Sequence, residues 1–184
     1  MKHSNRTRLA IIGLSVLLGS TIFLHAASRS EMRTEAREAL SELYSTTPAA
    51  RHLAESAKAV LVFPKIVKAG FVVGAQRGDG TLLSHGKAIG YFRTHAASYG
   101  LQAGVQRFGY ALFFMTDNDL DYLRRSGGWE IGTGPSVVIV NEGMARSFTT
   151  TTQRKGVYAF AFGQRGLMAG LGLQGTKITP IHPD

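Results

Sequence analysis

The segment GFVVGAQRGDGTLLSHGKAIGYF, residues 70–92, is representative of most of the chain and predicts its fold class. Short apolar runs are interrupted by glycines, and polar residues gather at Gly78-Asp79-Gly80. Two extended runs on either side of a glycine-containing turn are typical of a β-hairpin, so we predict one here with Gly78-Asp79-Gly80 as its turn. Similar runs predict further strands at residues 97–115, 135–140, 147–152, 156–162 and 166–175.

The last of these segments, GLMAGLGLQG, has glycines at the G-x-G-x-x-G spacing of dinucleotide-binding loops. Such a loop must open a helix within a βαβ unit, and the nine residues after Gly175 leave no room for one. We therefore exclude a nucleotide site. Leucine and alanine instead alternate with glycine, as expected for a strand with one bare face. Glycines within strands usually mark bends or a close neighbouring backbone, which predicts a strongly curved sheet.

Helices are predicted before the strands. Ser30 can cap a first helix, and Pro48 favours the start of a second one that continues through residues 49–60. In the first helix, apolar residues recur at helical spacing: Met32, Ala36, Leu40 and Leu43. Its polar face carries more acidic than basic residues, which favours packing on its own domain over binding to a membrane surface.

One more helix is predicted between the strands. Thr116 resembles the start of a capping box, and Gly127-Gly128 would end the helix. The expected fold is therefore α+β and β-rich. It is a single compact domain with a curved or barrel-like antiparallel sheet and N-terminal helices.

The N-terminus has the features of a targeting segment. Lys2, Arg6 and Arg8 precede the uncharged residues 9–24, a stretch shorter than the ~20 residues of a spanning helix. Small residues follow, so we expect a signal peptide at residues 1–27, with an uncleaved anchor as the alternative, and one domain at residues 28–184. Either way the domain lies outside the cytoplasm. A chain without cysteine suits the periplasm or cell envelope of a bacterium.

Basic residues outnumber acidic ones, 21 to 12, and they are unevenly distributed. Residues 56–116 contain a single acidic residue, Asp79, and residues 143–183 contain none. If these segments are neighbours, they form a positive surface that attracts anionic lipid headgroups, nucleic acid or acidic polymers. A solvated basic face without a partner is the alternative. Export disfavours nucleic acid.

The dipeptide Gln-Arg occurs beside glycine three times, ending at Arg77, Arg107 and Arg165. A weak internal repeat would place these arginines at equivalent strand ends, and chance would explain the recurrence equally well.

Motifs for catalysis or metal binding are not evident in the sequence. DNDLD at residues 117–121 begins like a calcium loop, but Tyr122 and Gly128 stand where such a loop needs glycine and glutamate. The six histidines lack metal-ligand spacing. We therefore expect no catalytic residue, no metal and no cofactor.

Three segments resemble the SYLF lipid-binding domain in its short exported bacterial form: residues 63–83, 128–140 and above all 155–178. The resemblance covers about residues 36–182. Eukaryotic members carry SH3 or FYVE modules, bind phosphoinositides and in some cases bind actin filaments. For this chain the resemblance implies binding of anionic phospholipid at the envelope, in agreement with the charge distribution.

We therefore predict a non-enzymatic protein that associates with anionic phospholipid or a membrane surface. The predicted lipid-binding residues lie in the family-like, acid-poor segments: Lys65, Lys68, Arg77, Lys155, Arg165 and Lys177. Two alternatives remain. A structural or interaction protein could pair with a protein partner through a sheet edge, such as Phe148–Thr152. An enzyme that modifies a lipid could use polar groups that converge in a cleft: Ser84, His85, Asp79 and Glu130.

Overall fold

The computed structural model describes residues 27–71, 73–99, 104–125, 127–140, 156–166 and 175–184. The helices of this part are α1 (Arg29–Thr46), α2 (Pro48–Ser56) and α3 (Asp117–Arg125). The strands are β1 (Ala59–Phe71), β2 (Val73–Ser84), β3 (Lys87–Tyr99), β4 (Gly104–Phe114), β5 (Trp129–Glu130), β6 (Val137–Val140), β7 (Val157–Gly166) and β8 (Lys177–Pro180). The predicted β-rich α+β class is confirmed.

The first helix begins two residues earlier than predicted, with Ser28 as its N-cap. Ser28 Oγ accepts a hydrogen bond from the Glu31 backbone N–H at 3.3 Å, and the Ser28 backbone N–H donates to Glu31 Oε2 at 2.8 Å. This capping box satisfies two backbone donors that the start of a helix leaves free. The predicted apolar stripe is buried: Met32, Ala36, Leu40 and Leu43.

The second helix starts at Pro48 as predicted but ends at Ser56, short of residue 60. The chain leaves the helix there because the sheet begins. The Lys58 backbone N–H donates to the carbonyl of Phe114 at 2.8 Å, and Ala59 then pairs with Phe114 in the β1–β4 ladder. Tertiary pairing thus overrides the helical propensity of the last four residues.

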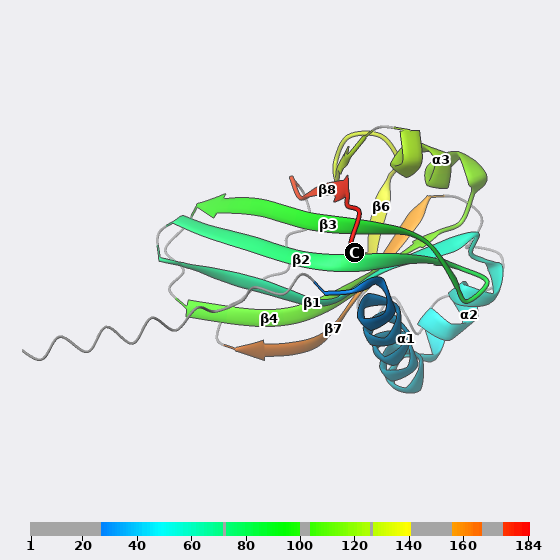
Figure 1. The fold of residues 1–184 in the computed structure, drawn as a ribbon, viewed down its shortest axis with the longest axis horizontal. Coiled ribbons are helices and arrows are strands. Elements are labelled where there is room, and N and C mark those ends of the chain that lie inside the picture. Colours follow the sequence, from blue (N-terminus) through cyan, green and yellow to red (C-terminus); the bar gives the residue numbers. More distant parts are fainter. Residues whose placement is uncertain (1–26, 72, 100–103, 126, 141–155, 167–174) are drawn as a thin grey trace, which may run out of the picture.

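The strands form one sheet in the order β5-β8-β3-β2-β1-β4-β7-β6. Neighbouring strands are antiparallel except β6 and β7, which run parallel, so the sheet is mixed at one edge and not antiparallel throughout. Residues 141–156 separate those two strands in the sequence, enough for the crossover that parallel pairing requires. Figure 1 shows β1–β4 as four long neighbouring strands that extend at one end well beyond the helices.

The sheet is curled, as contacts across one of its faces show. The rings of Phe114 on β4 and Trp129 on β5 have centroids 5.9 Å apart, although five strand spacings separate β4 from β5 in the sheet. At about 4.8 Å per spacing a flat sheet would hold them more than ~20 Å apart. Likewise Tyr110 Oη donates to Thr94 Oγ1 at 2.8 Å across two intervening strands. We call this concave side the inner face.

Glycines on β2 make the inner face narrow enough for these contacts. A Cβ on Gly80 would lie 2.5 Å from Phe63 Cδ1, and one on Gly78 would lie 2.7 Å from Ile66 Cγ1. Side chains from β1 therefore occupy the space above both glycines. The prediction that Gly78-Asp79-Gly80 forms a hairpin turn is wrong, since all three lie inside β2. The turn lies at His85-Gly86 instead, where φ is +47° and +74°.

The inner face holds one of two apolar clusters. Phe63, Leu82, Tyr110 and Phe114 pack there with Trp129. Leu120 and Leu123 from α3 join the same cluster, so α3 covers one end of the inner face. The predicted third helix is thereby confirmed, and Thr116 Oγ1 caps it by accepting the Asp119 backbone N–H at 3.2 Å.

The second cluster lies on the opposite, outer face. Val60, Val62 and Phe113 project there against Leu43 of α1 and Leu53 of α2. The buried Thr81 of β2 fixes the position of α1 further, because its hydroxyl donates to the carbonyl of Met32 at 3.1 Å. The helices α1 and α2 lie on the other side of the sheet from α3 (Figure 1).

Several predictions concern residues outside the described ranges. These are the signal peptide and its alternative as an anchor, the strand at residues 147–152, and most of the glycine-rich strand at residues 166–175.

We expect Gly80→Ala to lower the free energy of unfolding by about 2–3 kcal/mol, because the new Cβ would overlap the ring of Phe63 and the carbonyl of Val62. Urea unfolding measures the effect. Gly90→Ala on β3 is the matched control, since its Cβ would come only within 3.0 Å of Phe92 Cε2. Equal losses for the two variants would contradict the close packing described for β2.

The buried Tyr110 gives the stability a pH dependence. Burial raises the pKa of Tyr110 well above its usual value of 10.0, and the hydrogen bond with Thr94 offsets part of that rise. The unfolded chain therefore releases this proton near pH 10 while the folded chain keeps it, so stability falls as the pH rises above about 10. Tyr110→Phe should reduce that fall and cost about 1 kcal/mol at neutral pH. Urea unfolding at pH 7 to 11 tests this, with the exposed Tyr122→Phe as control; an unchanged fall would contradict it.

Candidate functional site

Strand register builds a row of basic positions across the outer face. Lys177 on β8 pairs with His95 on β3, and His95 pairs with Arg77 on β2. Arg77 pairs with Val67 on β1. The row continues on the far side of β1, where Val67 pairs also with Arg107 on β4, and Arg107 with Arg165 on β7. Directly paired residues project from the same face of a sheet. We call Lys177, His95, Arg77 and Arg107 the basic row, and the backbone position of Arg165 continues it.

The basic row is exposed to solvent and holds like charges near one another. Lys177, His95, Arg77 and Arg107 are all exposed. Lys177, Arg77 and Arg107 stand on every second strand of the row, about 10 Å apart, a distance at which like charges still repel at low salt. The acidic residue at this level, within the described ranges, is Glu130 of β5 at the edge, opposite Lys177. Three cations in one row therefore oppose folding, and an anionic partner would relieve that repulsion.

One residue pair nearer the helices, an acidic side chain partly neutralises the basic side chains of the outer face. Arg93 Nε and Nη2 donate to the two carboxylate oxygens of Asp79 at 2.6 and 2.8 Å. The hydrogen bonds with Asp79 raise the pKa of Arg93, so the pair stays charged. Lys65 pairs with Asp79 from the other side and is exposed, which leaves one net positive charge at this level.

The inner face carries a polar row at the same end of the sheet. Lys68 on β1 pairs with Gln76 on β2 and with Gln106 on β4. Both glutamines are buried. Gln76 Nε2 donates to Thr176 Oγ1 at 3.2 Å, whereas the buried Gln106 Oε1 has no hydrogen-bond partner among the described residues. Lys68 therefore lies on the opposite face from the basic row.

Beyond the basic row, the ends of β1–β4 are apolar and exposed. Small residues come first, with Ala75 paired to Ala69 and Ala69 paired to Val105. The last outward-facing residues are Phe71 and Val73, which pair with each other. Phe71 is 77%, Val105 56% and Val73 54% exposed. We call Phe71, Val73 and Val105 the apolar tip.

The structure brings together part of the predicted site. Lys65, Arg77 and Lys177 share the outer face with the backbone position of Arg165, and Lys68 lies on the inner face. Lys155 is outside the described residues.

The predicted binding residues did not include Arg107, His95 or the apolar tip. The repeated Gln-Arg dipeptide contained the signal for Arg107. Both β2 and β4 pair with β1. Gln76-Arg77 and Gln106-Arg107 therefore lie at the same level, on either side of Val67-Lys68.

The four groups proposed for a lipid-modifying enzyme do not converge. Ser84 Oγ lies 3.1 Å from His85 Nδ1 and donates to the carbonyl of Lys58 at 2.9 Å. Asp79 is engaged with Arg93, five residues and about 16 Å further along β2. Glu130 lies at the edge strand β5. Of the four, only His85 borders either of the two hollows beside α1.

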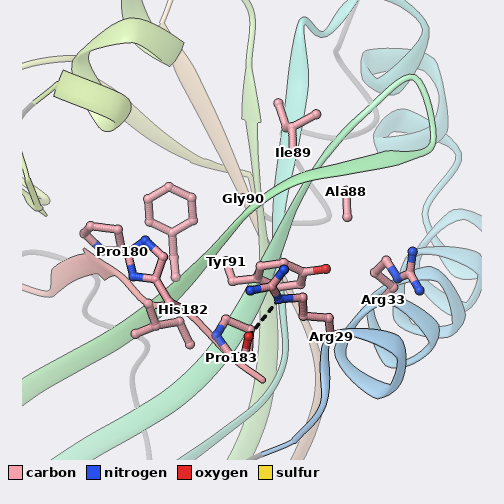
Figure 2. Close-up of a pocket in the computed structure, with 11 residues that line it drawn as sticks. Arg29, Arg33, Ala88, Ile89, Gly90, Tyr91, Pro180, His182 and Pro183 are labelled. Atoms are coloured by element: carbon pink, nitrogen blue, oxygen red, sulfur yellow. Dashed lines mark hydrogen bonds between the residues drawn. The ribbon is translucent and has the colours of Figure 1, made fainter.

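Two hollows adjoin α1. One, of about 590 Å³, lies between α1, β3 and the C-terminal residues (Figure 2). Arg29 points across it, and its Nε donates to the carbonyl of Pro183 at 2.7 Å. The Ile181 backbone N–H donates to the carbonyl of Tyr91 at 2.9 Å. These hydrogen bonds therefore hold the C-terminal residues against α1 and β3.

The other hollow, of about 410 Å³, lies between α1, α2 and the β2–β3 turn, with Arg37, Arg51 and Tyr44 in its wall. Arg37 Nη2 donates to the carbonyl of Gly86 at 2.9 Å. Burial raises the pKa of Tyr44, and the charge of Arg51 lowers it in part. Like the first hollow, it lies beside the helices and not at the basic row.

Among the described residues, no helix combines the length and the apolar character of a transmembrane span. Within the same ranges, no group of three or more histidine, aspartate or glutamate residues could hold a metal ion.

Residues 95–182 match the model of the Ysc84 family, which is described as Las17-binding protein actin regulator. This part of the chain belongs to the SYLF family. The match begins within β3 and ends beyond β8, so it includes Lys177, His95 and Arg107 of the basic row. A search of the curated proteins found no match. The SYLF family is associated with lipid binding and is not a known family of enzymes.

The repulsion within the basic row gives a prediction for the SYLF domain. Arg107→Gln should raise the free energy of unfolding by about 0.5 kcal/mol at low salt, because Arg107 lies level with Arg77 across β1 and the two positive charges repel. The gain should shrink above ~0.15 M salt, where charges at the surface are screened. Urea unfolding at two salt concentrations measures it. Arg124→Gln on α3 is the control, and a gain that ignores salt would argue against repulsion.

Proposed function

We propose that this SYLF domain binds anionic phospholipid headgroups at a membrane surface, reversibly and without chemical turnover. The basic row supports the proposal most directly. It presents the exposed cationic side chains of Lys177, Arg77 and Arg107 in a line across β8, β2 and β4, with few acidic neighbours. Phosphate groups of lipids would lie against this line and offset the repulsion within it.

The expected strength follows from the number of charges. Each lysine or arginine near an anionic membrane contributes about 1 kcal/mol, and the attraction decays within a Debye length. The basic row with Lys65 supplies several such contacts. Binding should therefore be weak for any one residue, additive over several, and sensitive to salt.

We further propose that the domain acts in the periplasm or cell envelope of a bacterium. The uncharged residues 9–24 behind a basic N-terminus support export. The description of the Ysc84 family names Las17 and actin. We favour lipid over those partners for this chain, because an exported protein would not meet a cytoplasmic filament.

Co-sedimentation with vesicles of varied anionic content tests the proposal. The parent should bind more as anionic content rises and less as salt rises. Arg77→Gln, Arg107→Gln and Lys177→Gln combined should weaken binding by more than about tenfold. The matched control removes the same charge from the helices, by Arg51→Gln, Arg124→Gln and Arg125→Gln. Equal binding of the two triple variants, or lipid found altered afterwards, would contradict the proposal.

Asp79 allows a test in the opposite direction. Asp79→Asn removes the carboxylate beside Lys65 and leaves the charge of Arg93 uncompensated. We expect affinity for anionic vesicles to rise about fivefold, the effect of one further charge near the surface. The same sedimentation assay measures it. A fall in affinity, with the fold intact by circular dichroism, would mean that Asp79 takes part in binding.

A further inference from the structure

The ends of β1–β4 point to a specific mode of attachment, which rests on the proposed lipid binding. We propose that the apolar tip inserts between lipid headgroups into the acyl region while the basic row stays at the level of the phosphates. The sheet would then stand with its long strands steeply inclined to the membrane.

The spacing between the two features matches the thickness of a membrane interface. Arg77 is four residues from Val73 along β2, and Val67 is four residues from Phe71 along β1. At about 3.3 Å per residue the tip lies ~13 Å beyond the basic row. Each interfacial layer of a bilayer is only about 5–8 Å thick, from the difference between total and hydrocarbon thickness. With the row at the phosphates, Phe71 and Val73 reach the acyl chains.

The segments that would enter the membrane contain no charge. Residues 69–76 and 96–106 have no aspartate, glutamate, lysine, arginine or histidine. The level between the row and the outermost pair, Phe71 and Val73, holds Ala69, Ala75 and the third residue of the tip, Val105. An exposed Phe71 beside Val73 has no role in either apolar cluster of the domain, and burial in lipid would recover the free energy that its exposure costs.

The backbone at this end is also suited to an apolar medium. Pairing of β1 with β2 extends to Phe71 and Val73, and pairing of β1 with β4 extends to Gly70 and Gly104. β2 pairs with β3 as far as Tyr99. Unpaired backbone groups would cost several kcal/mol each in hydrocarbon, and the ladders satisfy those of the inner strands almost to their ends.

A flat orientation on the outer face is less favourable. α1 and α2 pack on that face and rise about 10 Å above the sheet, so a flat membrane would meet them before the basic row. The exposed residues of α1 include four glutamates against three arginines. The helix therefore attracts anionic lipid less than the basic row does, and an inclined sheet brings the row to the surface without α1.

Tryptophan fluorescence tests insertion. The test uses the chain from residue 28, which contains both apolar clusters and every hydrogen bond described above. Its one tryptophan, Trp129, is 1% exposed and provides a constant background. In Phe71→Trp, vesicles rich in anionic phosphatidylglycerol should shift the emission to shorter wavelength, and brominated acyl chains should quench it. Ile89→Trp, exposed near the β2–β3 turn at the opposite end of β3, should show neither change.

A second variant measures the contribution of the tip. Phe71→Ser with Val73→Ser should lower the vesicle partition coefficient by about tenfold and leave its salt dependence unchanged, because only apolar contact is removed. Circular dichroism checks the fold. If the parent binds anionic vesicles in a salt-sensitive manner but Phe71→Trp is neither shifted nor quenched, insertion is wrong and the proposed function stands. If the parent does not bind, the proposed function itself fails.

Discussion

The close approach of Phe63 and Ile66 to the bare backbone of Gly80 and Gly78 is the contact on which the rest of the structure depends. Side chains on β2 at these positions would hold β1 and its neighbours apart. Without them the sheet curls enough for Tyr110 to reach Thr94 and for Phe114 to meet Trp129. The curl creates an enclosed inner face that a flat sheet of the same strands would not have.

The curl also determines how the apolar residues are divided between the two faces of the sheet. The inner cluster fills the concave side with help from α3, and the outer cluster lies under α1 and α2. Both clusters occupy the same end of the long strands, so the other end receives no cover from the described helices. That end carries the basic row on one face, the buried glutamines on the other, and the apolar tip. The covered end therefore stabilises the domain, and the open end carries the residues that we propose for binding.

The exposed end is unfavourable for the isolated domain in two ways. Lys177, Arg77 and Arg107 hold like charges in one row, and Phe71 is left in water. Both costs would fall at an anionic membrane, where phosphates compensate the charges and acyl chains cover the ring. A lipid-modifying enzyme would instead need converging titratable groups, and Asp79, the acidic residue next to the basic row, is held by Arg93. The arrangement therefore favours adsorption over catalysis.

Local patterns in the sequence were enough to predict the helices, the β-rich class and the curvature of the sheet. Helical spacing from Met32 to Leu43, the cap at Thr116 and glycine within apolar runs all act through neighbours in the chain. The turn at Gly78-Asp79-Gly80 was mispredicted because the same glycines that favour turns also make room for side chains from another strand. A single sequence does not distinguish those two uses.

The site depended on register, which only the tertiary structure decided. Composition predicted a positive surface and named Lys65, Arg77 and Lys177, but a shift of one residue would have turned any of them to the other face. A bulge after Val62 in β1 places Lys65 on the outer face and Lys68 on the inner one. Pairing with β1 also brings Arg107 level with Arg77, thirty residues away in the sequence. Charge and hydropathy are properties of residues, whereas a row exists only once hydrogen bonds have aligned the strands.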